Sequence, residues 1–315
     1  WNLVTERAQI AFVGRRLHHG MLPVRAICVA NADGKQATPL PHTGCTRRCR
    51  LDLIDSPSQL FWVQQNLLLY GDDYRIFTVP VGGTPELIGG QFGSFEQFSV
   101  DSAGDRVAAG APSCPRCNGP VTLLDVPSGV LVGRIGGKKV DNVTPSISPD
   151  GGKVVFARYT SGDSEHTLGP GLWTASADGS NLRRIVAKGA MPLWSPNGVT
   201  IAYLAKPPRW STLQLVSPEG GKSRTLLSGV WSVYGWSPDG TQIALELGRS
   251  QRLAVVNVAT GKVRTLLRLH FASTVHWSAD SQELLVKTQP QRTNRCASLR
   301  RVPAGGGKPQ LLRSC

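Results

Sequence analysis

The sequence predicts an all-β fold, a seven-bladed β-propeller of four-stranded antiparallel blades, with six blades as the alternative. One phrase recurs along the chain: a short strand, a Ser-Pro-Asp-Gly turn and a second apolar strand. A second family of Gly-containing turns recurs at spacings of 40 to 50 residues. No window of 11 residues combines helical periodicity with capping residues, so we expect helices to be nearly absent.

The recurring phrase is clearest at Trp236-Ser237-Pro238-Asp239-Gly240, which leads into a strand at 242–247. Ser and Asp side chains bond to nearby backbone N–H groups, so their repetition indicates turns and argues against nucleophilic serines. The Trp residues of the phrase are interpreted as packing between blades. Looser and weaker copies begin at Phe98-Ser99-Val100-Asp101, Ile147-Ser148-Pro149-Asp150, Trp194-Ser195-Pro196-Asn197 and Trp277-Ser278-Ala279-Asp280.

The second turn family supplies the positive φ angles that tight hairpins need. Seven such turns in 315 residues give a mean repeat of 45, which is typical of a propeller blade. The turns are Asp33-Gly34, Gly82-Gly83, Ser128-Gly129, Asp178-Gly179, Gly220-Gly221, Thr260-Gly261 and Gly305-Gly306.

Each repeat unit then provides four strands, and the whole chain, 1–315, is one propeller domain. The first unit is the least regular, with strands expected at 2–4, 9–13, 25–30 and 35–38. Units two to four are expected at 60–64, 66–70, 74–79, 86–88; 96–100, 106–109, 121–125, 130–135; and 144–148, 153–158, 171–176, 181–186. Units five to seven are expected at 191–195, 200–204, 212–217, 223–227; 232–236, 242–247, 252–257, 262–267; and 274–278, 283–287, 297–302, 309–312.

The Ser-Pro-Asp-Gly phrase, followed by an Ile-Ala-Phe-type strand, resembles the WD40-like repeat of TolB-like propellers. The match is strong in units four to six, recognisable in units three and seven, and poor in units one and two. The resemblance implies a closed ring of blades with the phrase in the two inner strands. Members of that group range from protein-interaction scaffolds to propeller domains of peptidases and polysaccharide lyases.

A net charge of +14 favours anionic partners such as a charged surface or an acidic polysaccharide. Aromatic residues are only 7% and are explained by blade cores, so specific nucleic-acid binding is not expected. No apolar run is long enough to span a bilayer. Basic residues recur near the outermost strands and predict a belt around the rim: Lys35, Arg183, Arg184, Lys222, Arg224, Lys262, Arg264 and Lys308.

The seven cysteines indicate an oxidising compartment, so we expect a secreted, periplasmic or envelope-associated protein. Cys114 and Cys117 form a C-x-x-C that is interpreted as a structural clasp, with a zinc site or a redox pair as alternatives. Cys45 and Cys49 can pair with each other or complete such a zinc site. A bridge between Cys296 and Cys315 would hold the C-terminus, which leaves Cys28 unpaired.

No nucleophile, metal or cofactor signature is present, so we predict no cofactor and no catalytic residue. A binding site should lie at a channel mouth, where the inner strands converge. The candidate residues there are Glu96, Gln97, Asn142, Tyr234 and His276.

The leading hypothesis is a monomeric bacterial propeller that binds protein partners as a non-catalytic scaffold. The alternative is a metal-dependent lyase that acts on acidic oligosaccharides in the channel, supported by His276 and Gln97 as metal ligands. A third possibility is a sensor or receptor domain of a longer chain, because the sequence opens at Trp1.

Overall fold

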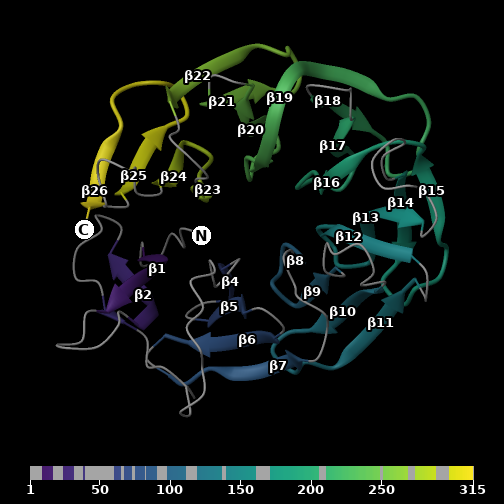
Figure 1. Ribbon diagram of the computed structural model, residues 1–315, viewed down its shortest axis with the longest axis horizontal. Coiled ribbons are helices and arrows are strands. Elements are labelled where there is room, and N and C mark those ends of the chain that lie inside the picture. The colour runs from purple at the N-terminus through teal and green to yellow at the C-terminus, as the bar shows by residue number, and fades with distance from the viewer. Residues whose placement is uncertain are drawn as a thin grey trace.

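The computed structural model arranges its sheets in a ring, with the first and last units side by side (Figure 1). All secondary-structure elements of the described residues are β-strands, in agreement with the expected all-β fold. The described residues are 9–16, 24–31, 38–39, 60–64, 67–72, 75–81, 83–90, 98–110, 119–136, 140–160, 171–205, 211–248, 251–268, 274–288 and 298–314.

The strands of each unit pair in sequence order by antiparallel hairpins. The first three units contain β1 (Gln9–Arg16), β2 (Val24–Asn31), β3 (Thr38–Pro39); β4 (Leu60–Gln64), β5 (Leu67–Asp72), β6 (Arg75–Pro80), β7 (Glu86–Gly90); and β8 (Phe98–Val100), β9 (Arg106–Ala109), β10 (Val121–Asp125), β11 (Leu131–Ile135). The fourth and fifth contain β12 (Val140–Ile147), β13 (Lys153–Thr160), β14 (Gly171–Ser176), β15 (Arg183–Val186); and β16 (Ala190–Trp194), β17 (Ile201–Ala205), β18 (Ser211–Val216), β19 (Arg224–Trp236). The sixth continues with β20 (Gln242–Leu247), β21 (Arg252–Asn257), β22 (Val263–Arg268), and the seventh contains β23 (Thr274–Trp277), β24 (Glu283–Thr288), β25 (Ser298–Pro303), β26 (Gln310–Ser314).

Units five and six share one strand, where the sequence predicts two. β19 runs from the outer edge of unit five to the inside of unit six, so β16 to β22 form one seven-stranded sheet (Figure 1). Val230 pairs with Ser211 in β18 and with Leu247 in β20. Gly229 adopts a φ of 80° and accepts a 2.9 Å hydrogen bond from the backbone N of Gly248, which allows the strand to pass between the blades without a loop.

The hydrophobic core is divided into clusters that lie between successive units. The second strand of unit four shows how. Val154 and Phe156 pack toward unit three, whereas Val155 and Ala157 pack toward unit five. Successive side chains of a strand point to opposite faces, so a strand covered on both faces has a continuous apolar run. The same geometry explains the Ile-Ala-Phe-type segment that follows each turn phrase.

The all-β propeller predicted from the repeat is confirmed. The described strands form six sheets; counting the shared strand in two units gives seven repeat units, the first with three described strands. The number of seven blades stays a prediction. Across the described ranges, no helix is long and apolar enough to cross a membrane.

Candidate binding surface

One face of the ring carries both families of turns. In an up-and-down sheet, the loop from the first to the second strand and the loop from the third to the fourth strand lie at the same end. Both loops of unit three and the first loop of unit four line one pocket, which confirms that they share a side. We call this side the turn face. It brings together the most regular elements of the sequence.

A buried serine fixes the first turn in units four to seven. In unit six, the Ser237 hydroxyl donates to Asp239 Oδ1 at 2.6 Å and accepts the backbone N–H of Gln242 at 2.9 Å. Ser148, Ser195 and Ser278 make the same two kinds of bond, and Asn197 replaces the acid in unit five. These hydroxyls are therefore committed to turn geometry, as the repetition predicts.

Unit three closes the same turn with a different side chain. The backbone N of Asp101 bonds to Arg106 O at 3.1 Å, and Gly104 N bonds to Asp101 O at 3.3 Å. These bonds match those of Ser237 with Gln242 and Gly240, so Asp101 occupies the serine position of the phrase. The sequence alignment of Phe98-Ser99 with the Trp-Ser pair of the other units is thus wrong, because the serine position is occupied by Asp101, two residues after Ser99. Asp101 Oδ1 accepts N–H groups of Asp105 and Arg106 at 2.9 and 3.2 Å.

Neighbouring blades are hydrogen-bonded to each other at and beside these turns. The indole N–H of Trp236 donates to Leu193 O at 3.2 Å, and that of Trp277 donates to Gly235 O at 3.1 Å, each in the preceding unit. Asp239 N donates to the hydroxyl of Ser281 at 3.0 Å in the following unit. The turn face is a continuous bonded surface over units five to seven, and the Trp residues join blades as expected.

Three arginines of the predicted basic belt reach from an outer strand to the next unit. Arg183 donates to Pro218 O at 3.1 Å, Arg224 to Val258 O at 2.9 Å, and Arg264 to Ala304 O at 3.2 Å. The three carbonyls occupy the same place in the second turn of their units. Three of these belt residues therefore also connect blades through hydrogen bonds. The described belt residues are exposed, as expected: Arg183, Arg184, Lys222, Arg224, Lys262, Arg264 and Lys308.

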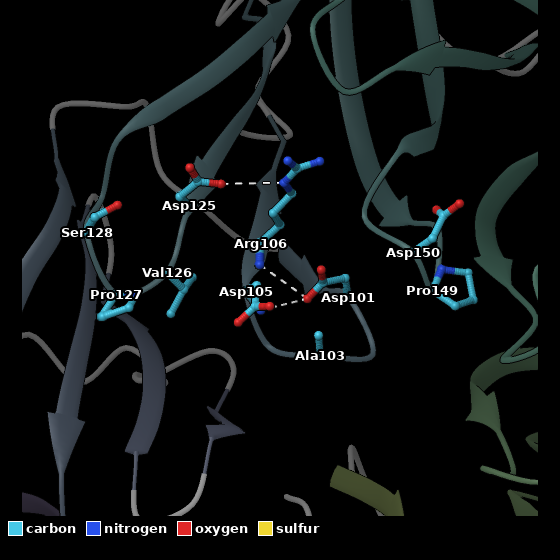
Figure 2. A pocket seen from close by; sticks show the side chains of 10 residues that line it. All are labelled: Asp101, Ala103, Asp105, Arg106, Asp125, Val126, Pro127, Ser128, Pro149 and Asp150. Carbon is cyan, nitrogen blue, oxygen red and sulfur yellow. Dashed lines mark hydrogen bonds and ion pairs between the residues drawn. The ribbon is translucent and has the colours of Figure 1, made fainter.

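An acidic pocket of about 480 Å³ opens between the turns of units three and four (Figure 2). Its charged lining consists of Asp101, Asp105, Asp125, Asp150 and Arg106. Arg106 pairs with Asp125 at 3.4 Å and donates to Gly151 O at 2.9 Å. The hydroxyl of Ser148 and the backbone N–H of Gly152 lower the pKa of Asp150, which keeps that carboxylate ionised at neutral pH.

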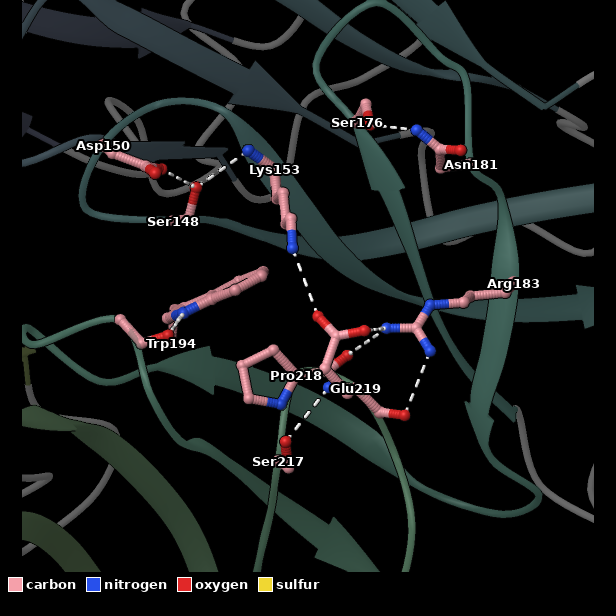
Figure 3. Close-up of polar contacts among 11 residues, drawn as sticks. Ser148, Asp150, Lys153, Ser176, Asn181, Arg183, Trp194, Ser217, Pro218 and Glu219 are labelled. Atoms are coloured by element: carbon pink, nitrogen blue, oxygen red, sulfur yellow. Dashed lines mark hydrogen bonds and ion pairs between the residues drawn. The ribbon is translucent and has the colours of Figure 1, made fainter.

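A second pocket of about 440 Å³ lies between the turns of units four and five and shares Pro149 and Asp150 with the first. We call it the proline pocket because Pro149, Pro196 and Pro218 line it. Glu219 at its edge contacts Arg183 and bonds to Lys153 Nζ at 3.2 Å (Figure 3). The Lys153 hydrogen bond and the Arg183 charge lower the pKa of Glu219.

Exposed Val199 and a bonded indole complete the proline pocket. Val199 has 63% of its surface exposed and lies in the turn between β16 and β17. Trp194 is buried, and its indole N–H donates to Gly198 O at 3.0 Å. The pocket therefore combines an apolar rim with polar groups that are already bonded to one another. Such a surface suits recognition of another molecule without chemical change.

The three predicted channel-mouth residues that the structure describes belong to three different units. Asn142 in unit four is fully buried and donates to Gly119 O of unit three at 2.8 Å. Asn142 Oδ1 accepts a hydrogen bond from Arg158 Nε at 2.7 Å, and the Arg158 guanidinium lies 4.6 Å from the centre of the Trp173 ring. Asn142 thus links two blades.

Tyr234 and His276 lie in the inner strands of units six and seven. The Tyr234 hydroxyl donates to Glu246 Oε2 at 2.9 Å, and burial together with that carboxylate raises the pKa of Tyr234. His276 is half-buried in β23, and burial lowers its pKa well below the usual value. Glu96 and Gln97 lie outside the described residues, so ligand binding by this set stays a prediction.

The predicted disulfides also lie outside the described residues, which omit Cys45, Cys49, Cys114, Cys117, Cys296 and Cys315. Cys28 is in β2, opposite Phe12 of β1. Among the described residues, no group of three or more His, Cys, Asp or Glu side chains is arranged to hold a metal ion.

The residues that line the two pockets were not predicted from the sequence. The predicted site lies on inner strands, whereas the pockets lie on the turn face, where Asp125, Pro218 and Glu219 come from the second turn family. The signal was present in the sequence. Because both turn families must share one end of each antiparallel sheet, charges in both families gather on one face.

No family model matches the chain. The chain is similar to the Protein TolB homolog of Chlorobium luteolum, with 30% identity over 129 residues that cover 39% of this chain and 28% of that relative. It therefore spans less than a third of the curated relative. TolB from Acinetobacter baumannii has a similar structure, with a TM-score of 0.57 and 13% identity over 96% of this chain and 81% of that one. The chain is a TolB-like β-propeller.

The TolB-like fold is also similar to that of an enzyme. An oligogalacturonate lyase from Vibrio parahaemolyticus has a TM-score of 0.62 and 12% identity, over 84% of this chain and 80% of that one. Likeness at this identity concerns the fold alone, so function must be argued from the residues of the surface.

Proposed function

We propose that this TolB-like propeller is a non-catalytic protein-binding module and that the turn face binds the partner. The observation that carries the proposal is that the serine hydroxyls of that face are engaged in structural hydrogen bonds. Ser148, Ser195, Ser237 and Ser278 are buried and bonded within their own turns. A rigid face with two adjoining pockets supports recognition, because little conformational entropy is lost on binding.

The test is site-specific photo-crosslinking. A benzophenone amino acid at Val199, on the proline pocket, should crosslink a specific protein in cells. The same group at Leu311, 55% exposed on the outer strand β26, is the matched control and should not capture that protein. With the purified partner, Val199→Arg should weaken binding at least about tenfold, which corresponds to about 1.4 kcal/mol. Capture from Leu311 and not from Val199 would exclude the turn face.

We also infer a location in the cell envelope, supported by the similarity to TolB and by seven cysteines in a β-rich chain. The predicted pairing leaves Cys28 as the single free thiol. Alkylation under denaturing conditions should add about one group before reduction and seven after it. Intact mass measures both numbers. Seven groups without reduction, in protein isolated from its native compartment, would contradict the inference.

The second candidate is a lyase acting on acidic oligosaccharides, favoured by the structural likeness to the oligogalacturonate lyase and by the net charge of +14. The residues that bind the metal in such a lyase would include His276 and Gln97. Incubation with oligogalacturonate and manganese would produce an unsaturated sugar that absorbs ultraviolet light. Product that is lost in His276→Ala, together with failed crosslinking at Val199, would replace the binding proposal with this one.

A further inference from the structure

Two exposed aliphatic side chains lie on the outer rim of unit three, where it adjoins unit two. Val130, just before β11, is 58% exposed, and Leu131, the first residue of β11, is 49% exposed. A Cβ atom at Gly129 would lie 2.3 Å from Ile88 O, so the backbone of the unit-three turn contacts β7 at this point. We call Val130 and Leu131 the rim patch.

The rim patch is next to the edge of an outer strand, β11, whose one charged side chain is Arg134. β11 is the last strand of its sheet in the order β11-β10-β9-β8, so one side of its backbone has no strand partner among the described strands. Three other outer strands have Arg183, Arg224 or Arg264 at one equivalent position. In β11 that position is Gly133, where an added Cβ would lie 2.2 Å from Ala177 O. Charged side chains on an edge strand discourage the pairing of another chain, and β11 has none at its first three residues.

The acidic pocket adjoins the rim patch along the chain. Pro127 and Ser128 line the pocket, and Val130 follows two residues later. The pocket's four aspartates and one arginine sum to −3, while the chain as a whole carries +14. A basic segment is therefore repelled by most of the surface and attracted here.

We propose that the rim patch and the acidic pocket together bind an extended segment of a partner protein in which aliphatic and basic side chains alternate. The segment adds as a strand to the edge of β11, its aliphatic side chains cover the rim patch, and its lysine or arginine residues enter the pocket. Alternation suits an added strand because successive side chains point in opposite directions. This inference rests on the proposed protein-binding function and adds a partner chemistry to it.

The experiment measures fluorescence anisotropy of a labelled decapeptide of alternating valine and lysine. Two control peptides replace lysine by glutamate or valine by serine. The full chain should bind the first peptide, bind the serine peptide at least about tenfold more weakly, and leave the glutamate peptide unbound. Added salt should weaken binding, because exposed charges are screened.

Two double variants locate the site on the protein. Val130→Ser with Leu131→Ser removes the apolar contact, and Asp105→Asn with Asp125→Asn removes two charges. Each should raise the Kd for the valine–lysine peptide at least about tenfold. Leu311→Ser and Asp178→Asn are matched controls, since Leu311 is 55% exposed on another outer strand and Asp178 is exposed in another second turn. Both should leave the Kd within about twofold.

Several results would overturn the inference. Equal affinity for the serine peptide would show that charge alone binds. Conversion of a dimer to a monomer by the valine–leucine variant, measured by light scattering, would assign the patch to contact between copies of the chain. A partner that crosslinks from Val199 with full affinity for both double variants would leave the protein-binding function intact and exclude this site alone.

Discussion

Units three and six close the same backbone turn with different side chains, Asp101 in one and Ser237 in the other. Both accept the N–H of the residue five positions later, at 3.2 and 2.9 Å. The backbone bonds are shared, so the turn geometry is the common element and the side chain is the variable one. In unit six the hydroxyl is neutral and buried, whereas in unit three a carboxylate lines the acidic pocket. In unit three the acid of the turn is thus at the serine position itself, whereas in unit six it is Asp239, two residues after the serine.

The largest expected effect separates two glycines of equivalent turns. A Cβ at Gly104 would lie 1.7 Å from Val63 O, whereas at Gly198 the nearest atom is 3.8 Å away. Both residues have positive φ, 78° and 75°, so alanine costs roughly 1–2 kcal/mol at either. Gly104→Ala also forces two backbones apart and should lose roughly 3–5 kcal/mol in total.

Urea denaturation compares the free energies of unfolding of the two alanine variants. Gly198→Ala is the matched control, since it changes φ preference without the clash. Equal losses in the two variants would mean that the close approach of unit three to unit two relaxes freely, contrary to this expectation.

The next effect tests whether serine and aspartate are interchangeable in the turn. Ser237→Ala leaves the N–H of Gln242 without its side-chain acceptor and should cost about 1–3 kcal/mol. Asp101→Ser restores the residue of the other units and should change stability by less than about 0.5 kcal/mol, whereas Asp101→Ala should cost about 1 kcal/mol. The measurement is again the urea midpoint. A serine variant as unstable as the alanine variant would contradict the proposed equivalence.

The smallest effect is the response of the turns to acid. Hydrogen bonds from Ser148 and Gly152 lower the pKa of Asp150, and that of Asp280 is lowered by Ser278 and Gln282. The folded protein then binds fewer protons than the unfolded chain, so this stabilisation is complete above the unfolded pKa of about 3.9. The stabilisation is lost as the pH falls through the lowered pKa values that these two carboxylates have in the folded protein.

Unit five supplies the control for that response, because Asn197 stands where unit four has Asp150. Asp150→Asn should leave stability near pH 7 almost unchanged and reduce the loss of Tm between about pH 4 and 2 by a few degrees. Calorimetry across this range measures it. A larger acid-induced loss in the variant would reverse the assigned sign.

The fold could be predicted because the repeat imposes the same local chemistry several times. Ser-Pro-Asp-Gly specifies a turn wherever it occurs, and runs such as Val154 to Ala157 specify a strand covered on both faces. The shared strand β19 could not be predicted in this way, since only the tertiary position of Gly229 and Gly248 removes the loop between two blades. The pockets were missed for a similar reason. Their residues come from turns of different units, and no local pattern states which turns adjoin.

The strand shared by units five and six also couples their fluctuations. Elsewhere among the described strands, adjacent sheets share no strand, although single backbone bonds such as that from Gly119 N to Val140 O join units three and four. At Val230 both ladders use the same residue, so the amides on either side of it open together. We therefore expect these two blades to exchange their amide hydrogens as one cooperative unit of seven strands, and the ring to unfold locally in segments of unequal size.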